Sequence, residues 1–275
     1  MNMDKEDDSI TEIKQELVET DDLTTDLEAE KKLKPEEEDE DEEEIVEAED
    51  AEEEVVIEDE AEKPEQIKTL KQIVYGFLGA PYERGPLGEG DNEKLYRTDA
   101  FDCTTLVLVT ASKFNSNGTS PEEMMKKVNY YPAGTVSYEN RLHFSTYRNK
   151  VSPFFKDITS DVGGQKTKEK TVILNKERDK EGRLIDIDWQ EEIRIKYIAK
   201  KDVPGIISRL PLEVGVAFIV DGDEKIGLDV RHEGFVFDRE KLVHASSSRG
   251  KVFEENFLDF LEKSNYSAVL FFEII

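Results

Sequence analysis

The sequence is poor in the residues that crosslink a chain or bind metal ions. It has one cysteine, Cys103, and three histidines in 275 residues. A single cysteine excludes an internal disulfide, and no group of cysteines is present to hold a structural zinc ion. The histidines, His143, His232 and His244, lack the paired spacing of a zinc site. We therefore expect neither a metal nor another cofactor.

Long apolar runs are also missing. No window approaches the roughly 18 consecutive apolar residues that a membrane-spanning helix needs. The N-terminus has no basic stretch followed by an apolar run, which is the pattern of a signal peptide. The sequence therefore predicts a soluble protein without membrane contact, and a cytoplasmic location by the absence of a signal peptide.

Positive charge is scarce at the N-terminal end. Residues 1–63 contain 31 Asp and Glu against 6 Lys, whereas residues 64–275 contain 34 acidic residues against 31 basic ones. Residues 1–63 have no aromatic residue and long acidic runs, so they cannot bury enough apolar surface to fold. We expect a disordered acidic tail, which acts either as a solvating extension or as a docking segment for a basic protein. Neither part has a net positive charge, so nucleic acid is not an expected partner.

Residues 64–275 have the length of one domain with its own core. Hydrophobic periodicity predicts helices first and a mostly antiparallel sheet second, which is an α+β arrangement. The predicted helices cover residues 66–77, 103–114, 120–128, 138–150, 202–210 and 254–263. The predicted strands cover residues 170–174, 192–198, 214–220, 233–237, 242–245 and 268–275.

Cys103 stands at the start of a predicted helix. Asp102 is a good N-cap residue for that helix, and Thr105 follows at its third position. The free amides and the positive end of the helix dipole favour a thiolate there. A lone cysteine is otherwise most often a small buried hydrophobe, so the two readings are a packing thiol and a nucleophile that needs a base from elsewhere in the fold.

His232 and His244 supply a candidate base and its partner. They lie twelve residues apart, at the start of one predicted strand and within the next. A tight turn between two antiparallel strands brings such positions onto one face, within hydrogen-bond reach. One histidine could then orient the other and fix its tautomer, as catalytic triads require.

Several blocks carry a family resemblance. They are Gly-Ala-Pro-Tyr82 with Gly88-Glu-Gly90, Phe-Asp-Cys-Thr-Thr105, Tyr138-Glu-Asn-Arg-Leu-His143-Phe, Gly227-Leu-Asp-Val-Arg-His232 and His244-Ala-Ser-Ser247. In this order they resemble the NlpC-type cysteine peptidases and amidases of bacterial cell walls, and within them the N-acetylmuramoyl-L-alanine amidase-like branch. The resemblance implies a circularly permuted papain-like fold, with N-terminal helices packed on a C-terminal antiparallel sheet.

The resemblance also implies roles for individual residues. Cys103 would attack the amide between N-acetylmuramic acid and L-alanine in a muramyl peptide or peptidoglycan fragment. His232 would hold the thiolate and protonate the leaving amine, and His244 would orient His232. The backbone amide of Cys103 and the Tyr82 hydroxyl would stabilise the oxyanion. The remaining substrate-binding candidates are Arg141, His143 and Asp229.

This chain departs from the branch at some points. Leu108 stands where we expect a Glu after the Cys-Thr-Thr turn, and Tyr147 stands near the position of an expected Trp. Relatives usually carry export signals, so the resemblance suggests the periplasm or cell envelope instead of the cytoplasm. Two alternatives stay open: a peptide-stem endopeptidase of the same superfamily, and a non-catalytic interaction protein whose acidic tail binds a basic partner.

Overall fold

The computed structural model describes residues 69–90, 93–179 and 181–275. The predicted acidic tail and the first residues of the predicted helix 66–77 lie outside these ranges. Within them, no helix is long and apolar enough to cross a membrane.

Local capping signals define the helices of the first half. Thr69, Asp102 and Ser120 each accept a hydrogen bond from a backbone amide of the first turn. This contact satisfies one of the amides that a helix leaves unpaired at its start. The helices that follow these caps are α1 (Leu70–Tyr75), α2 (Cys103–Phe114) and α3 (Pro121–Val128).

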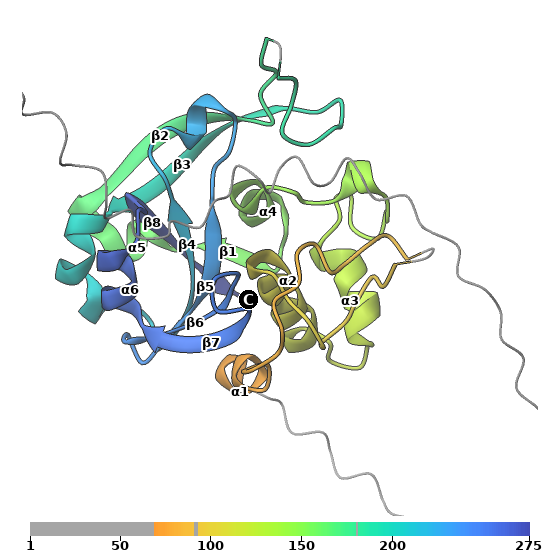
Figure 1. The fold of residues 1–275 in the computed structure, drawn as a ribbon, viewed down its shortest axis with the longest axis horizontal. Helices are drawn as coiled ribbons and strands as arrows, with labels where there is room; N and C mark the ends of the chain where they lie inside the picture. The colour runs from red at the N-terminus through yellow and green to blue at the C-terminus, as the bar shows by residue number, and fades with distance from the viewer. Residues whose placement is uncertain (1–68, 91–92, 180) are drawn as a thin grey trace, which may run out of the picture. The chain divides into compact units, whose positions relative to one another are not determined.

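An antiparallel sheet occupies the second half, in the order β2-β3-β8-β4-β5-β6-β7, and β1 pairs separately with β8. Strand β8 therefore lies in the middle of the sheet although it ends the chain, and Figure 1 shows it beside β4. The strands are β1 (Phe155–Asp157), β2 (Thr167–Leu174), β3 (Glu191–Ala199), β4 (Glu213–Ile219), β5 (His232–Phe237), β6 (Lys241–Ser246), β7 (Lys251–Asn256) and β8 (Ala268–Ile274).

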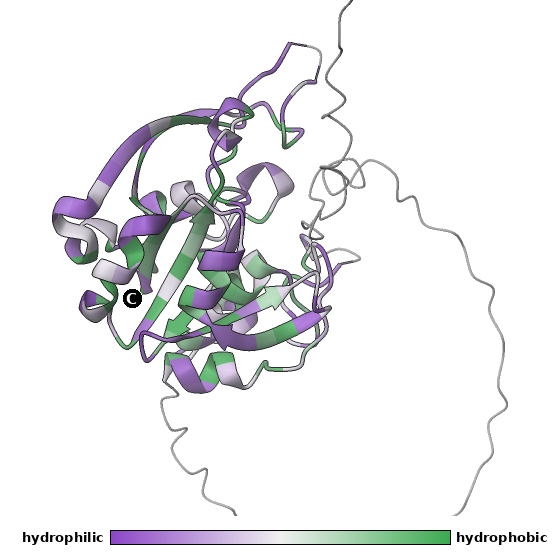
Figure 2. Cartoon of the chain, turned by 60° about the vertical axis from the view of Figure 1, so that its left-hand side comes forward, coloured by the Kyte–Doolittle hydropathy of each residue, from purple (hydrophilic) through white to green (hydrophobic). Residues whose placement is uncertain are grey.

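The sheet separates two apolar clusters. Alternate residues of one strand reach opposite faces, so Ala217 and Ile219 of β4 join one cluster while Val216 and Phe218 join the other. The first cluster includes α1, α2 and α3, and the second includes α6 (Phe257–Lys263) and the turns after β3. Figure 1 shows these helices on the two sides of the sheet, and Figure 2 shows hydrophobic residues along its central strands.

Helix α2 is the central helix of the first cluster. Its residues from Thr105 to Ser112 are all buried, which explains why it lacks a polar face. Leu108 is 3 % exposed in this core. The site where we expected a Glu is therefore a packing position in this chain, and an unpaired carboxylate there would be costly.

Three sequence predictions need correction. The helix expected over residues 138–150 is two short elements, η2 (Tyr138–Asn140) and α4 (Ser145–Val151), because Arg141 pairs with Tyr130 in a β-bridge between them. The helix expected over residues 202–210 consists of two 3-10 turns, η4 (Lys200–Gly205) with Pro204 inside it and η5 (Ile207–Arg209). Strand β7 was not predicted; its residues 254–256 were assigned to a helix that begins only at Phe257.

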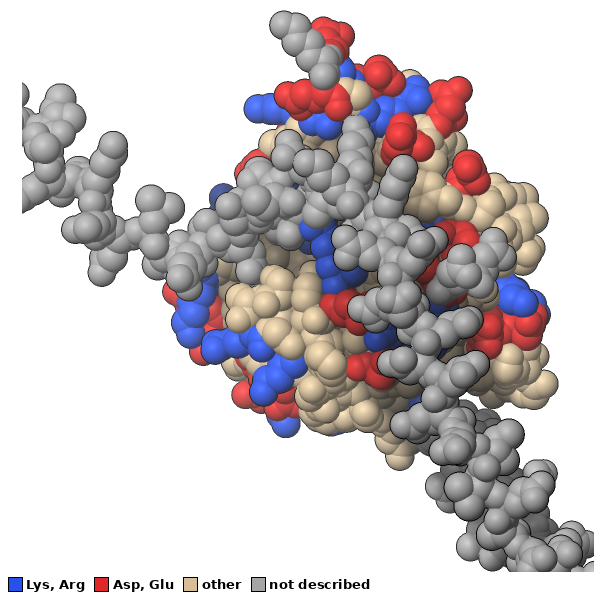
Figure 3. Space-filling model, turned by 45° about the vertical axis from the view of Figure 1, so that its right-hand side comes forward, with Lys and Arg blue, Asp and Glu red and all other residues tan. Residues whose placement is uncertain are grey.

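The other predicted elements are present with shifted ends. Strand β2 pairs antiparallel with β3 along its whole length. On the face shown in Figure 3, basic and acidic side chains are interspersed, as expected from the near balance of charge in residues 64–275.

Candidate active site

Cys103 is the first residue of α2, as predicted. The Asp102 carboxylate accepts a hydrogen bond from the Thr105 amide at 2.7 Å, and the Thr105 hydroxyl accepts one from the Asp102 amide at 2.9 Å. This reciprocal capping box fixes the direction in which the chain enters the helix. The other Asp102 oxygen accepts the Gly85 amide at 3.0 Å, a contact that the sequence did not reveal. Asp102 therefore ties the loop of residues 79–90 to the turn that carries the cysteine.

His232 and His244 contact each other as the hairpin spacing predicted. Nε2 of His232 lies 2.6 Å from Nδ1 of His244. The register of β5 and β6 pairs Phe235 with Val243, so the two histidines are diagonal neighbours on one face of the sheet. Gly234 lies between them, and a Cβ there would come within 2.9 Å of the His244 Cβ. The absence of a side chain at position 234 thus leaves room for the pair.

Aromatic rings surround both imidazoles. His232 stacks parallel to Tyr266 and also contacts Phe218. His244 is 2 % exposed and packs against Phe253 and Phe260. Such packing leaves each ring little freedom to rotate, so the contact between the two nitrogens is held by the fold.

Glu255 is a further polar residue in contact with the histidine pair. Oε1 of Glu255 lies 2.9 Å from Nε2 of His244. The sequence did not indicate Glu255 because its pattern predicts a helix over residues 254–263, where the structure has the end of strand β7. The acidic residue eleven positions after His244, within a third strand, was the available signal.

The sulfur of Cys103 lies against the start of β5. The backbone amide of Glu233, the residue after His232, donates a hydrogen bond to it. Burial raises the thiol pKa to about 12, with further contributions from the carboxylates of Asp102 and Glu233. This burial acts against the stabilisation that the helix N-terminus gives to a thiolate.

Whereas the pKa of Cys103 is raised, that of His232 is lowered. Burial, and then the neighbouring His244, hold it well below 6.5. A buried imidazole resists protonation because the charged form loses its hydration. The two shifts both favour a neutral thiol and a neutral imidazole over a preformed ion pair.

A buried ion pair lies behind this arrangement. Arg148 of α4 contacts both carboxylate oxygens of Glu233, at 2.6 and 3.2 Å, and the two side chains are 0 % and 1 % exposed. The guanidinium also lies 4.4 Å from the centre of the Phe155 ring. Because the amide of the same Glu233 contacts the Cys103 sulfur, the ion pair supports the backbone that faces this sulfur.

Tyr82 lies beside the turn that leads to α2. It forms a β-bridge with Phe101, two residues before Cys103, and its amide donates to the Gly250 carbonyl at 2.9 Å. The backbone therefore brings the predicted oxyanion residue close to the start of the helix.

Arg141 and His143 lie together but are engaged within the protein. The Arg141 guanidinium pairs with Glu89 and donates to the Leu87 carbonyl at 3.2 Å. Nε2 of His143 lies 2.8 Å from the Tyr138 carbonyl, and burial lowers the His143 pKa to about 4. Both residues line a pocket whose other walls are Tyr131, Glu139, Asn140, Leu142, Phe144, Tyr147, Ile187 and Trp189.

Asp229 caps a helix in this structure. It is 2 % exposed, and one carboxylate oxygen accepts the amide and the hydroxyl of Thr146 in the first turn of α4. Its other oxygen accepts the Val230 amide at 2.8 Å. Helix α4 has no cap from its own N-cap residue, Phe144, so Asp229 supplies that contact from a distant loop.

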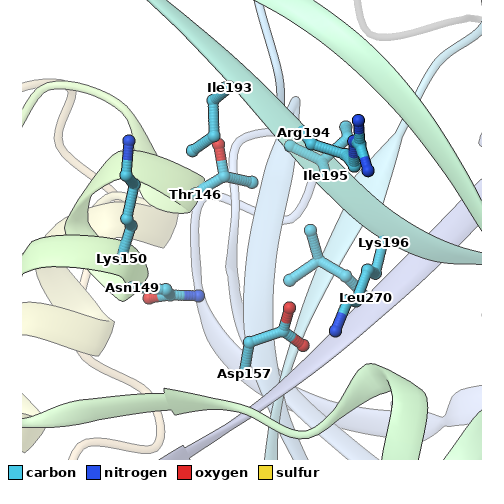
Figure 4. Close-up of a pocket in the computed structure, with 9 residues that line it drawn as sticks. All are labelled: Thr146, Asn149, Lys150, Asp157, Ile193, Arg194, Ile195, Lys196 and Leu270. Carbon is cyan, nitrogen blue, oxygen red and sulfur yellow. The ribbon is translucent and has the colours of Figure 1, made fainter.

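A second pocket lies between α4 and β3 (Figure 4). Thr146, Asn149 and Lys150 face Asp157, Leu270 and residues 193–196 across it. None of the predicted site residues lines this pocket. Among the residues that the structure describes, no group of three or more His, Cys, Asp or Glu side chains gathers to hold a metal ion.

Solved structures share this fold. A protein from Legionella pneumophila has 25 % identity and a TM-score of 0.63, over 75 % of this chain and 88 % of its own. An N-acetylmuramoyl-L-alanine amidase from Bacteroides uniformis has 20 % identity and a TM-score of 0.56, over 74 % of this chain and 97 % of its own. A Bacteroides fragilis protein with a provisional xylanase name has 20 % identity and a TM-score of 0.59, over 74 % and 100 %. A search of the curated proteins found no match.

The domain is thus an amidase-like α+β fold with an antiparallel sheet. A family model described as AmiA-like, N-acetylmuramoyl-L-alanine amidase-like, matches residues 72–268. The chain belongs to this amidase-like family.

Proposed function

We propose that the protein is a cysteine amidase that cleaves the bond between N-acetylmuramic acid and L-alanine in peptidoglycan fragments. The observations that carry the proposal are the His232–His244 contact of 2.6 Å and the contact between the sulfur of Cys103, at the first position of α2, and the amide of Glu233, the residue after His232. Membership of the amidase-like family supports the substrate class. The order of a cysteine helix before histidine strands supports an NlpC-type, circularly permuted papain-like fold.

The neutral resting pair defines the first chemical step. As the Cys103 sulfur attacks the carbonyl carbon, its proton passes to Nδ1 of His232, since Nε2 of that ring is engaged with His244. The negative charge on the carbonyl oxygen is stabilised by the amide of Cys103 at the helix N-terminus and by the Tyr82 hydroxyl. Because the Cys103 thiol has a pKa of about 12, proton transfer during attack avoids the cost of forming a free thiolate first.

The remaining steps return the enzyme to its starting state. His232 gives its proton to the departing amine, the C–N bond breaks, and a thioester joins the lactyl carbonyl to Cys103. Water then attacks the thioester as His232 accepts its proton, and the sulfur leaves with a proton from His232. The net reaction consumes one water and yields a carboxylate and a free amino-terminal L-alanyl peptide.

The test is to incubate the protein and its Cys103→Ala variant with a series of muramyl peptides and identify the products by mass. We expect free L-alanyl peptides from the wild type and none from the variant. Cleavage within the peptide stem, also dependent on Cys103, would indicate an endopeptidase of the same superfamily. Equal product from both proteins, or none from either, would contradict the proposal, and the second outcome would favour a non-catalytic interaction protein.

The acidic segment is tested in the same assay. We expect deletion of residues 1–63 to change kcat/KM by less than about twofold, because an acidic segment without aromatic residues contributes little apolar contact. The measurement is the initial rate at several substrate concentrations. A loss of roughly tenfold or more would assign the segment a part in substrate binding or stability.

A further inference from the structure

Glu255 completes a line of three polar side chains across neighbouring strands. β6 and β7 pair Leu242 with Glu255 and His244 with Phe253, so Glu255 is the diagonal neighbour of His244 on one face. His244 is in turn the diagonal neighbour of His232 on β5. The hydrogen bonds along this line measure 2.6 and 2.9 Å.

The chemistry of a carboxylate fixes the direction of these hydrogen bonds. An ionised carboxylate can only accept, so Nε2 of His244 must carry the proton that it donates to Glu255. A neutral imidazole has one donor and one acceptor nitrogen, so Nδ1 of His244 must accept. Nε2 of His232 is therefore the donor to His244, and Nδ1 of His232 keeps its lone pair.

This tautomer is the one that the proposed reaction needs. If Nδ1 of His232 carried the proton, the ring could not take another from Cys103. The carboxylate also favours the positive charge that appears on His232 during attack, through the hydrogen-bond chain that His244 relays. The Glu255 side chain is 29 % exposed, so its carboxylate is partly open to solvent.

We propose that Glu255 is a positioning residue that sets the tautomers of His244 and His232 and leaves Nδ1 of His232 free to accept the Cys103 proton. The proposal rests on the proposed amidase function for its kinetic consequence. Its structural part, the tautomers, is independent of any activity.

The chain offers a direct test because it has only three histidines. In protein labelled with ¹⁵N-histidine, long-range ¹H–¹⁵N spectra distinguish the two neutral tautomers and the charged ring. We expect the Nε2–H form for all three histidines in the wild type at neutral pH. His143, whose Nε2 contacts the Tyr138 carbonyl, serves as the internal reference.

The variant Glu255→Gln replaces the pure acceptor with a group that can also donate. Its NH₂ can donate to Nε2 of His244, which reverses the chain and moves the proton of His232 to Nδ1. We expect a substantial Nδ1–H population for His232 and His244, and no change for His143. Glu255→Asp keeps an acceptor and should retain the wild-type tautomers.

Kinetics provide the second readout. We expect Glu255→Gln to lower kcat roughly 10- to 100-fold with KM unchanged, and Glu255→Asp to recover most of the loss. The matched control is Glu254→Gln, which makes the same charge change one residue earlier, where the side chain points to the other face of β7. Its kcat should stay within about twofold of the wild type.

The spectra decide the outcome. Wild-type tautomers in Glu255→Gln would overturn the proposal, whatever the rate. Altered tautomers with reduced kcat would support it in full. Altered tautomers in a protein whose wild type releases no L-alanyl peptide would support the positioning of the histidines and contradict the amidase function.

Discussion

Replacing His232 with alanine should lower kcat/KM for a muramyl peptide by roughly 10²- to 10⁴-fold, the usual contribution of a general base. Without the imidazole, attack depends on the thiolate that exists before substrate binds. With a thiol pKa of about 12, roughly one molecule in 10⁵ carries that thiolate at pH 7.

The residual activity of His232→Ala has a distinctive pH dependence. It should rise about tenfold per pH unit through the neutral and alkaline range, because the thiolate fraction rises in that proportion below the thiol pKa. The wild type should instead be nearly constant there and lose activity only in acid. Since burial holds the His232 pKa well below 6.5, the acid limb should lie below pH 6.5, where His232 becomes protonated and can no longer accept the thiol proton.

The measurement is a pH–rate profile for the wild type, His232→Ala and His232→Gln. Glutamine nearly fills the space of the ring but cannot act as a base, so both variants should give the same slope. Alkylation of Cys103 by iodoacetamide across the same pH range reports the thiol pKa without any substrate. A wild-type profile in His232→Ala would contradict the assignment of His232 as the base.

Replacing Arg148 with methionine should destabilise the protein by about 3–5 kcal/mol, the usual cost of removing one partner from a buried ion pair. The variant leaves the Glu233 carboxylate without its bidentate partner in a site that is 1 % exposed. The free energy of unfolding from urea titrations measures the effect. Lys150→Met is the matched control, because its ion pair with Glu191 is on the surface and should be worth no more than about 1 kcal/mol.

A double variant would identify the cause of this loss. Arg148→Met combined with Glu233→Gln should recover much of the stability, since no buried charge is left unpaired. A loss of similar size in the double variant would mean that packing, not charge, causes it.

Local sequence signals predicted the parts of the site that depend on short spacings. The capping box needs only Asp102 and Thr105, and the histidine pair needs only a tight turn between two short strands. Both were confirmed because neighbouring residues determine them. The family resemblance then connected these parts to an amidase-like fold, and the family match agrees.

The parts that were missed depend on contacts between distant segments. Residues 251–256 form a strand because they pair with the edge of β6. This pairing brings Glu255 next to His244. Arg141 is not helical, contrary to the sequence prediction, because it pairs with Tyr130 in a β-bridge. Arg148 gave no signal, since arginine is seldom fully buried and its partner Glu233 is 85 residues away along the chain.

His232, His244 and Glu255 belong to three adjacent strands, whereas Cys103 begins helix α2. The proposed acid–base half of the site is therefore held by the hydrogen-bond ladder of the sheet, and it should keep its geometry until the sheet itself unfolds. Cys103 is positioned separately, by the Glu233 amide and by the loop that Asp102 holds through the Gly85 amide. A molecule that displaced this loop would move the Cys103 sulfur, while His232 and His244 kept their positions in the sheet.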